Sequence, residues 1–75
     1  MKNLLDLEKE HSGKIISLNG DQHFITRVTS IGLTPGCKVT ILKNEKRRPL
    51  LVYSRDTMIA LNRKECENST VEETA

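Results

Sequence analysis

The segment at residues 27–36, RVTSIGLTPG, limits the possible folds of this chain more than any other. A helix that ends at Ile31 places Gly32 where a left-handed backbone is needed, because glycine adopts that conformation without steric cost. Leu33 then packs back on Val28, one helical turn earlier. The segment therefore predicts a helix whose last turn is closed by backbone geometry.

Pro35 and Gly36 follow directly and suit the two central positions of a type II turn. We expect this turn to start a strand. No residue of the segment carries catalytic chemistry in this pattern. A closely specified backbone beside an apolar patch instead indicates a shaped protein surface, whose function is recognition.

Size and composition indicate one small folded domain, residues 1–75, with little room for a deep pocket. Hydrophobic residues make up 36% and charged residues 29%, as in ordinary folded domains. The net charge of +2 is too small to indicate nucleic-acid binding without a basic cluster. No apolar run approaches the ~18 residues of a membrane span, and charge interrupts residues 1–6 too early for a secretory signal. We therefore expect a cytoplasmic location.

Short β-branched or alternating runs, separated by turn-forming residues, predict strands along most of the chain. Leu42 breaks the alternation of the second run, and the polar residues 44–49 after it are typical of a hairpin loop. Residues 72–75 are expected to form a loose tail. The predicted strands are residues 14–18, 37–41, 50–54, 57–61 and 70–71.

One helix of about ten residues is predicted between the first two strands. Asp21 is a suitable N-cap, and Phe24, Val28 and Ile31 recur at helical spacing on a face that packs on the sheet. A further helical turn is predicted at residues 62–66. This order predicts a mostly β fold, a small SH3-like, partly open barrel of about five short strands with one short helix inserted after the first strand. An OB-fold is the alternative.

The basic cluster of the chain lies at residues 43–48 and is diluted by Glu45. Binding of single-stranded nucleic acid through Lys46, Arg47 and Arg48 is one alternative function. It is disfavoured because aromatic stacking contributes about 1 to 3 kcal/mol per base and the chain has one Phe and one Tyr. A solvated hairpin tip is the favoured interpretation. The charges also suit a membrane surface or an acidic partner.

Residues that could carry catalysis or hold a metal are scattered. His11 and His23 are isolated, and Cys37 and Cys66 form no Cys/His ligand spacing, so two reduced thiols are favoured over a disulfide. We find no Ser/His/Asp set, no Gly-rich phosphate loop and no evident pair of carboxylates. We therefore expect no enzyme, no catalytic residue, no metal ligand and no cofactor.

Nearly the whole chain resembles ferrous iron transport protein A (FeoA), a small cytosolic partner of the bacterial ferrous iron transporter. The most specific similarity is the segment at residues 27–36. The same SH3-like module is similar to the C-terminal domain of iron-dependent repressors of the diphtheria toxin repressor class. The other similar segments are LLDL at residues 4–7, GKII at 13–16 and MIALNR at 58–63.

Four positions depart from the family pattern. Glu10 stands where the family often has glycine, and Asp56 stands where glycine is common in a turn. Cys66 replaces the usual alanine, and Ser69 replaces an apolar residue. Aspartate tolerates positive φ, whereas Ser69 is expected to loosen the last strand.

The resemblance implies a non-enzymatic accessory protein that docks on the cytoplasmic, GTP-binding part of ferrous iron transport protein B. Such a protein supports or regulates ferrous iron uptake and lies at the inner face of the plasma membrane through its partner. The resemblance does not imply that this chain binds iron, which is the transporter's cargo. Direct binding or sensing of a transition metal ion or a nucleotide, through His11, His23, Cys37 or gathered carboxylates, is the main alternative.

We expect the partner-binding surface at the helix end and the turn that follows it. The apolar and basic side chains of this segment are expected to be exposed in part and ringed by polar groups. An exposed edge strand would also permit self-association. The predicted contact residues are Arg27, Ile31, Gly32, Leu33, Pro35 and Gly36.

Overall fold

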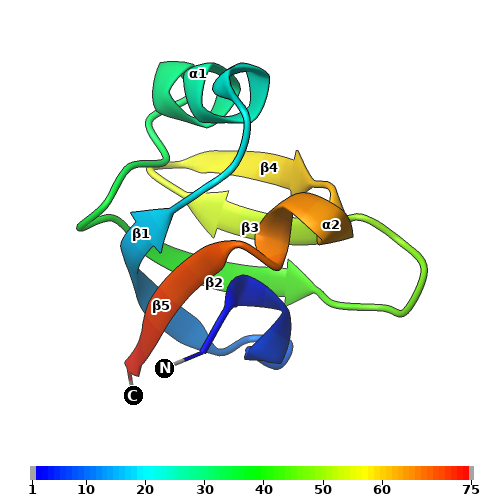
Figure 1. Ribbon diagram of the computed structural model, residues 1–75. Coiled ribbons are helices and arrows are strands. Elements are labelled where there is room, and N and C mark those ends of the chain that lie inside the picture. The colour runs from blue at the N-terminus through cyan, green and yellow to red at the C-terminus, as the bar shows by residue number, and fades with distance from the viewer. Residues whose placement is uncertain (1, 75) are drawn as a thin grey trace.

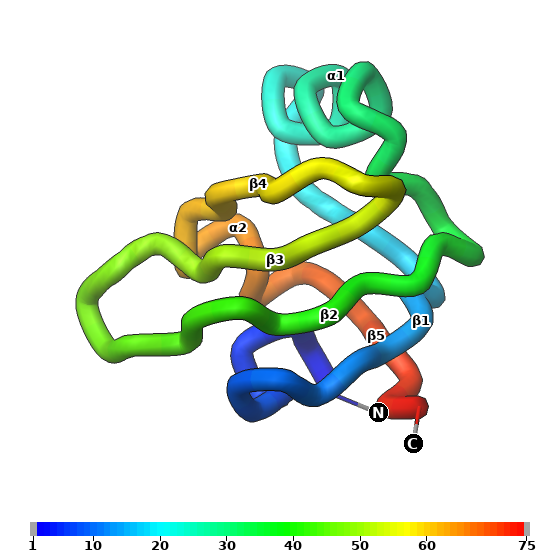
Figure 2. Tube along the Cα trace, turned by 180° about the vertical axis from the view of Figure 1, so that it is seen from behind, coloured from blue at the N-terminus to red at the C-terminus, as the bar shows by residue number. Residues whose placement is uncertain are grey.

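The computed structural model describes residues 2–74 as one open antiparallel sheet with a helix at one end (Figure 1). The strands are ordered β4-β3-β2-β1-β5. In both views α1 lies beyond β4, and the loop between β2 and β3 projects to one side (Figures 1 and 2). The elements are a 3₁₀ helix η1 (Leu4–Asp6), β1 (Ser12–Leu18), α1 (Gln22–Ser30), β2 (Lys38–Lys43), β3 (Leu50–Ser54), β4 (Thr57–Leu61), α2 (Arg63–Cys66) and β5 (Ser69–Thr74). The predicted mostly β fold with a helix after the first strand is confirmed.

The expected loose tail is wrong for residues 72–74, which belong to β5. Glu72 and Glu73 pair with Lys14 and Gly13 of β1. Strand pairing uses backbone groups, so it does not require the apolar pattern that the sequence lacks here. Ala75 lies outside the described residues.

One core fills the space between the sheet, α1 and η1. α1 contributes Phe24 and Val28, two residues of its predicted inner face. Ile31, the third, is the C-cap residue and remains 40% exposed. The 3₁₀ helix, which the sequence pattern did not predict, adds Leu4. The core residues are Leu4, Leu7, Ile15, Phe24, Val28, Leu33, Val39, Ile41, Leu50, Val52, Ile59, Leu61, Cys66 and Val71.

Two irregular positions of the sequence correspond to irregular backbone. The β2–β3 register shifts between Ile41 and Lys43, at the residue that breaks the predicted alternation. Arg55 and Asp56 form a two-residue hairpin turn in which both have positive φ, 51° and 63°. Glu10 also has positive φ, 71°. The two positions where the resemblance places glycine thus keep the left-handed conformation that favours glycine.

The expected loosening of the last strand at Ser69 is wrong, because its hydroxyl is buried and fully used. Ser69 Oγ accepts a hydrogen bond from the Leu4 amide at 3.0 Å and donates one to the Cys66 carbonyl. One side chain therefore joins η1, α2 and β5. A buried hydroxyl with both bonds satisfied costs little compared with an apolar residue.

Candidate partner-binding site

The end of α1 is closed by a pair of backbone hydrogen bonds. The Gly32 amide donates to the Thr29 carbonyl at 3.0 Å, and the Leu33 amide donates to the Val28 carbonyl at 2.8 Å. Gly32 has φ +87°. These features form a Schellman motif, the helix stop that the sequence predicted. The motif fixes the direction in which the chain leaves the helix.

The turn after the helix is equally well defined. Gly36 has φ +95°, and the Cys37 amide donates to the Thr34 carbonyl at 3.0 Å, as in the predicted type II turn. The Gly36 amide donates to the Ile15 carbonyl at 2.7 Å, and the Ile15 amide donates to the Cys37 carbonyl at 2.8 Å. Two backbone hydrogen bonds to Ile15, one from Gly36 and one to Cys37, therefore hold the turn against β1.

Leu33 is buried, which corrects the expectation that its side chain is exposed in part. Its relative exposure is 0%. As the second residue past the helix end, it folds back on Val28 and fills the space between the helix and the sheet. Leu33 therefore supports the surface residues around it through core packing and does not contact a partner itself.

The other predicted contact residues lie at the surface. Gly32 is half-buried, and the remaining four are exposed. We call the exposed set, Arg27, Ile31, Pro35 and Gly36, the helix-end surface.

Arg27 is held in place by two contacts. Its guanidinium binds the carboxylate of Glu65, and it lies 6.0 Å from the centre of the Phe24 ring. Because Arg27 and Ile31 are four residues apart, they share one face of α1. The helix-end surface thus combines a fixed cation with an exposed branched apolar side chain.

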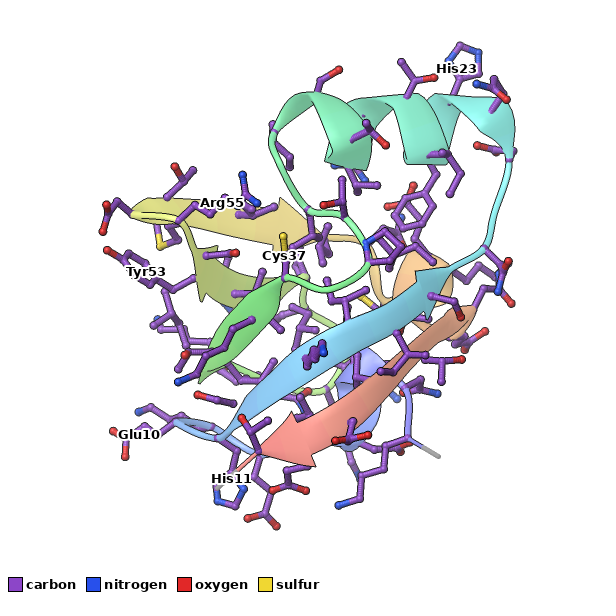
Figure 3. The ribbon with its side chains drawn as sticks, turned by 90° about the vertical axis from the view of Figure 1, so that its left-hand side faces the viewer. Glu10, His11, His23, Cys37, Tyr53 and Arg55 are labelled. Atoms are coloured by element: carbon purple, nitrogen blue, oxygen red, sulfur yellow. The ribbon has the colours of Figure 1, made fainter. Side chains whose placement is uncertain are left out.

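Arg55 and Cys37 also belong to this region, although the sequence analysis did not place them there. A Cβ atom at Gly32 would lie 3.4 Å from Arg55 Cδ, so the β3–β4 turn covers the helix stop. The Cys37 thiol donates to the Gly32 carbonyl at 3.1 Å. Figure 3 shows Arg55 and Cys37 on the same side of the molecule. No local sequence signal marks this contact, because Gly32 and Arg55 are more than twenty positions apart in the sequence.

The Cys37 thiol has a lowered pKa. Its main cause is the hydrogen bond with the Thr34 side chain, followed by the Thr34 backbone and the nearby charge of Arg55. A shallow hollow of about 470 Å³ lies beside it and is lined in part by Gly36 and Tyr53. The hollow is too open to enclose a small ligand, which favours a surface contact over a binding pocket.

The residues of the metal-sensing alternative do not come together. Figure 3 shows His11, His23 and Cys37 at separate places on the molecule. His11 Nδ1 lies 2.7 Å from Glu73 Oε2, and the same carboxylate binds Lys2. Within residues 2–74, no group of three or more His, Cys, Asp or Glu side chains is placed to hold a metal ion. The His11 side chain is therefore engaged by Glu73, and the described residues do not gather His11, His23 and Cys37 into one group.

Both cysteines are buried free thiols. In the same described part of the chain, no helix is long and apolar enough to cross a membrane.

Comparison with protein families identifies the chain. The model of the FeoA domain matches residues 2–73. The chain belongs to the FeoA family. FeoA proteins are small proteins related to ferrous iron transport, so the resemblance drawn from the segment at residues 27–36 is confirmed. A search of curated protein sequences gives no match.

Solved structures of FeoA proteins share the fold of this FeoA-family chain. An iron uptake regulatory protein (FeoA) superposes with a TM-score of 0.88 at 18% identity, over 97% of both chains. FeoA from Chlorobium tepidum gives 0.91 at 23% identity, over 99% of this chain and 71% of that one. FeoA from Stenotrophomonas maltophilia, complexed with zinc and described as an SH3 domain protein, gives 0.80 at 22% identity, over 96% and 91%. The SH3-like fold is confirmed.

The same fold occurs in a protein of another class. A manganese-dependent transcriptional repressor matches with a TM-score of 0.87 at 13% identity, over 97% of this chain and 41% of that chain. The predicted similarity to a repressor domain is thus confirmed at the level of fold. Because one module serves both classes, the fold alone does not identify the partner of this FeoA-family chain.

Proposed function

We propose that this chain is a non-enzymatic accessory protein that docks on the cytoplasmic, GTP-binding part of ferrous iron transport protein B. It then lies at the inner face of the plasma membrane through that partner and supports or regulates ferrous iron uptake. Membership of the FeoA family supports the iron-transport context. The observation that carries the docking proposal is the helix-end surface.

The helix-end surface has the composition of a small interface. Protein interfaces place an apolar anchor at the centre and polar groups around it. Ile31 is an exposed large apolar residue, and Arg27 supplies a fixed charge on the same helix face. Pro35 extends the apolar part onto the turn.

Rigidity favours this surface as a binding site. Binding costs free energy when loops and side chains must be ordered, and a backbone that is already fixed reduces this cost. Here the Schellman motif and the type II turn fix Gly32 and Gly36, and buried Leu33 supports both from beneath. The partner therefore meets a preformed shape.

A titration of amide chemical shifts tests the proposal directly. The labelled chain is mixed with the soluble GTP-binding domain of the transporter from the same organism, first with GDP and then with a GTP analogue. We expect shift changes centred on residues 27–36. If no amide moves at high concentration, docking on this domain is rejected.

A matched pair of variants locates the contact. Ile31→Glu adds a charge at a side chain that is 40% exposed, and Ile16→Glu does the same at one that is 36% exposed on β1. Both variants are expected to stay folded, as checked by circular dichroism. We expect Ile31→Glu to weaken binding at least tenfold and Ile16→Glu to leave it unchanged. Equal affinities would remove the helix-end surface from the proposal.

An apolar pair elsewhere is the main competing contact. Tyr53 and Met58 face each other across β3 and β4 and are 42% and 63% exposed. Loss of binding in Met58→Glu together with unchanged binding in Ile31→Glu would move the interface to this pair. The docking function would then stand with a different site.

A further inference from the structure

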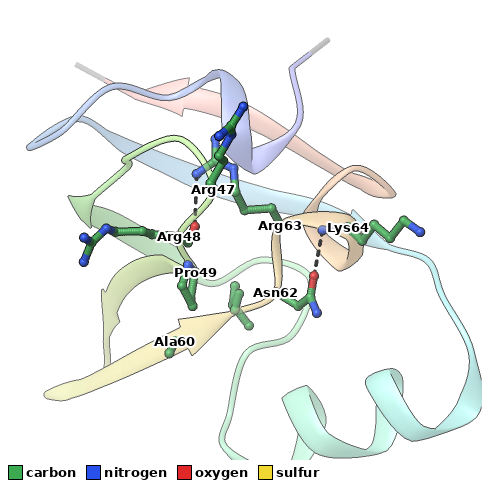
Figure 4. A pocket seen from close by; sticks show the side chains of 8 residues that line it. Arg47, Arg48, Pro49, Ala60, Asn62, Arg63 and Lys64 are labelled. Carbon is green, nitrogen blue, oxygen red and sulfur yellow. Dashed lines mark hydrogen bonds between the residues drawn. The ribbon is translucent and has the colours of Figure 1, made fainter.

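A second surface, rich in basic residues, lies at the other end of the sheet. An open hollow of about 470 Å³ lies between the β2–β3 loop and the start of α2 (Figure 4). Its rim carries Arg47, Arg48, Arg63 and Lys64, and small side chains including Pro49 and Ala60 line it between them. We call this feature the basic hollow.

The fold gathers these charges from two separate segments. Residues 43–48 and 63–64 together contain six basic residues and one acidic residue, Glu45. The sequence analysis saw only the first segment. The net charge of the whole chain is +2, so positive charge is concentrated here.

Hydrogen bonds hold the basic hollow in shape. Arg63 Nη1 donates to the backbone carbonyls of Glu45 at 3.0 Å and Arg48 at 3.4 Å, which ties α2 to the loop. The Asn44 side-chain amide donates to the carbonyls of Leu5 at 3.1 Å and Leu7 at 2.7 Å. The base of the loop is therefore fixed, while the side chains of Arg47 and Arg48 extend from it in different directions (Figure 4).

Among the described residues, most of these charges have no carboxylate partner. Within residues 2–74, the ion pair formed by a rim residue is that of Arg48 with Glu45, whose nearest atoms are 3.8 Å apart. Lys2 and Arg27, elsewhere in the chain, each bind a carboxylate directly, and exposed single cations such as Lys9 lie apart from the rim. The basic hollow is distinguished by four cations that lie together around one depression. An unneutralised basic surface attracts an anionic partner.

The shape and residue types of the hollow favour lipid headgroups over nucleic acid. Single-stranded nucleic acid needs aromatic side chains for stacking. Phe24 is buried, and Tyr53 lies toward the opposite end of β3. A projecting loop with long flexible cations instead matches a broad anionic surface, which a shallow and open hollow can contact without enclosing a ligand. We propose that the basic hollow and its loop bind anionic phospholipid headgroups at a membrane surface.

The membrane contact is compatible with partner docking but does not depend on it. The turn at Pro35 and Gly36 precedes β2, and the basic loop follows it. A strand of six residues spans roughly 20 Å. A chain that rests on lipid through the loop therefore leaves that turn accessible.

Sedimentation with vesicles tests the proposal on the full chain. Vesicles of phosphatidylglycerol and phosphatidylcholine in equal parts are compared with vesicles of phosphatidylcholine alone, at low and at physiological salt. We expect at least tenfold stronger binding to the anionic vesicles. The binding should weaken as salt rises, because charge attraction is screened within about 8 Å at physiological ionic strength. Equal binding to both compositions would overturn the proposal.

A charge-matched pair of variants separates the basic hollow from a general charge effect. Arg47→Gln with Arg48→Gln removes two charges from its rim. Lys9→Gln with Lys14→Gln removes two charges from exposed positions on another part of the chain. We expect the first variant to lose at least tenfold in affinity for anionic vesicles and the second to lose less than twofold. Equal losses in both variants would reject the basic hollow as the site.

Soluble anions complete the test. Pyrophosphate and a single-stranded oligonucleotide are titrated under the same low-salt conditions. Weak or absent binding of both, alongside vesicle binding, supports the lipid surface. Binding of pyrophosphate or the oligonucleotide without vesicle binding would overturn the proposal and assign the basic hollow to a free phosphate or to nucleic acid.

Discussion

The two ends of β2 differ in the interactions that define them. At the first end, backbone hydrogen bonds and the buried Leu33 and Cys37 define the Pro35 turn. At the second end, the loop at residues 44–49 is tied at its base, and its exposed cations extend into solvent. The first end thus offers a fixed shape, and the second offers charge. Substitutions should therefore affect folding at the first end and salt-dependent binding at the second.

The largest expected effect is that of Leu33→Ala. Removing a fully buried leucine leaves a cavity beneath the helix stop and costs about 3 kcal/mol of unfolding free energy. Lys46→Ala, at the exposed loop, should change stability by less than about 0.5 kcal/mol. Urea unfolding of both variants measures the difference. Similar free energies for the two would mean that the ends do not differ in this way.

The two cysteines should change the free energy of unfolding with pH in opposite directions. Burial raises the pKa of Cys66, near the basic end, to about 12. Above the ordinary thiol value of 9.0 the unfolded chain loses this proton while the native chain keeps it, so stability falls as pH rises from 9 toward 12. The slope from this group is at most about 1.4 kcal/mol per pH unit.

The pKa of Cys37, at the turn end, is lowered from the ordinary thiol value of 9.0. The native chain therefore loses this proton at a lower pH than the unfolded chain. The resulting stabilisation is complete above pH 9 and is lost as the pH falls through the native pKa. Urea unfolding between pH 7 and about 10.5 should show a shallower alkaline decline in Cys66→Ala than in the unsubstituted chain. In Cys37→Ala the stability gained between neutral pH and 9 should be missing. Identical pH profiles for all three chains would contradict both assignments.

The same contrast explains what could be predicted from the sequence. The end of α1 and the turn at Pro35 are encoded locally, since glycine and proline at fixed spacing specify backbone conformation. These features were predicted in their places, and so were the positions of the strands along the chain, except for the extent of the last strand. The most specific part of the family resemblance lies in the same residues.

The remaining features depend on contacts between distant segments. Leu33 was predicted to pack on Val28, yet its complete burial also needs the sheet beneath it. The contact of Arg55 with Gly32 and the addition of residues 63–64 to the basic loop join parts of the chain that local pattern does not connect. The pairing of residues 72–74 with β1 was missed because backbone pairing leaves no side-chain signature there.

Substitutions at residues with positive φ should also affect stability differently at the two ends of β2. Gly32 and Arg47 both have positive φ, +87° and 65°. Gly32→Ala should cost about 1 to 2 kcal/mol, because an L residue is strained in this conformation. Arg47→Gly relieves a similar strain but adds freedom to the unfolded chain, so we expect a change within about 0.5 kcal/mol. Thermal unfolding of both variants gives the comparison, and a larger effect at Arg47 would contradict it.

The smallest expected effect concerns the ion pairs at the two ends. Arg48 and Glu45 are 3.8 Å apart with side chains 76% and 57% exposed, so Arg48→Ala should cost less than about 0.5 kcal/mol. Arg27 and Glu65 are 46% and 29% exposed, and Arg27 also approaches the Phe24 ring. Arg27→Ala should therefore cost about 1 kcal/mol. Urea unfolding at low and high salt distinguishes the pairs, because salt screens the partly buried contacts of Arg27 less than the exposed pair of Arg48 and Glu45. A salt-sensitive loss at Arg48 that exceeds the loss at Arg27 would show that charge also stabilises the fold at the basic end.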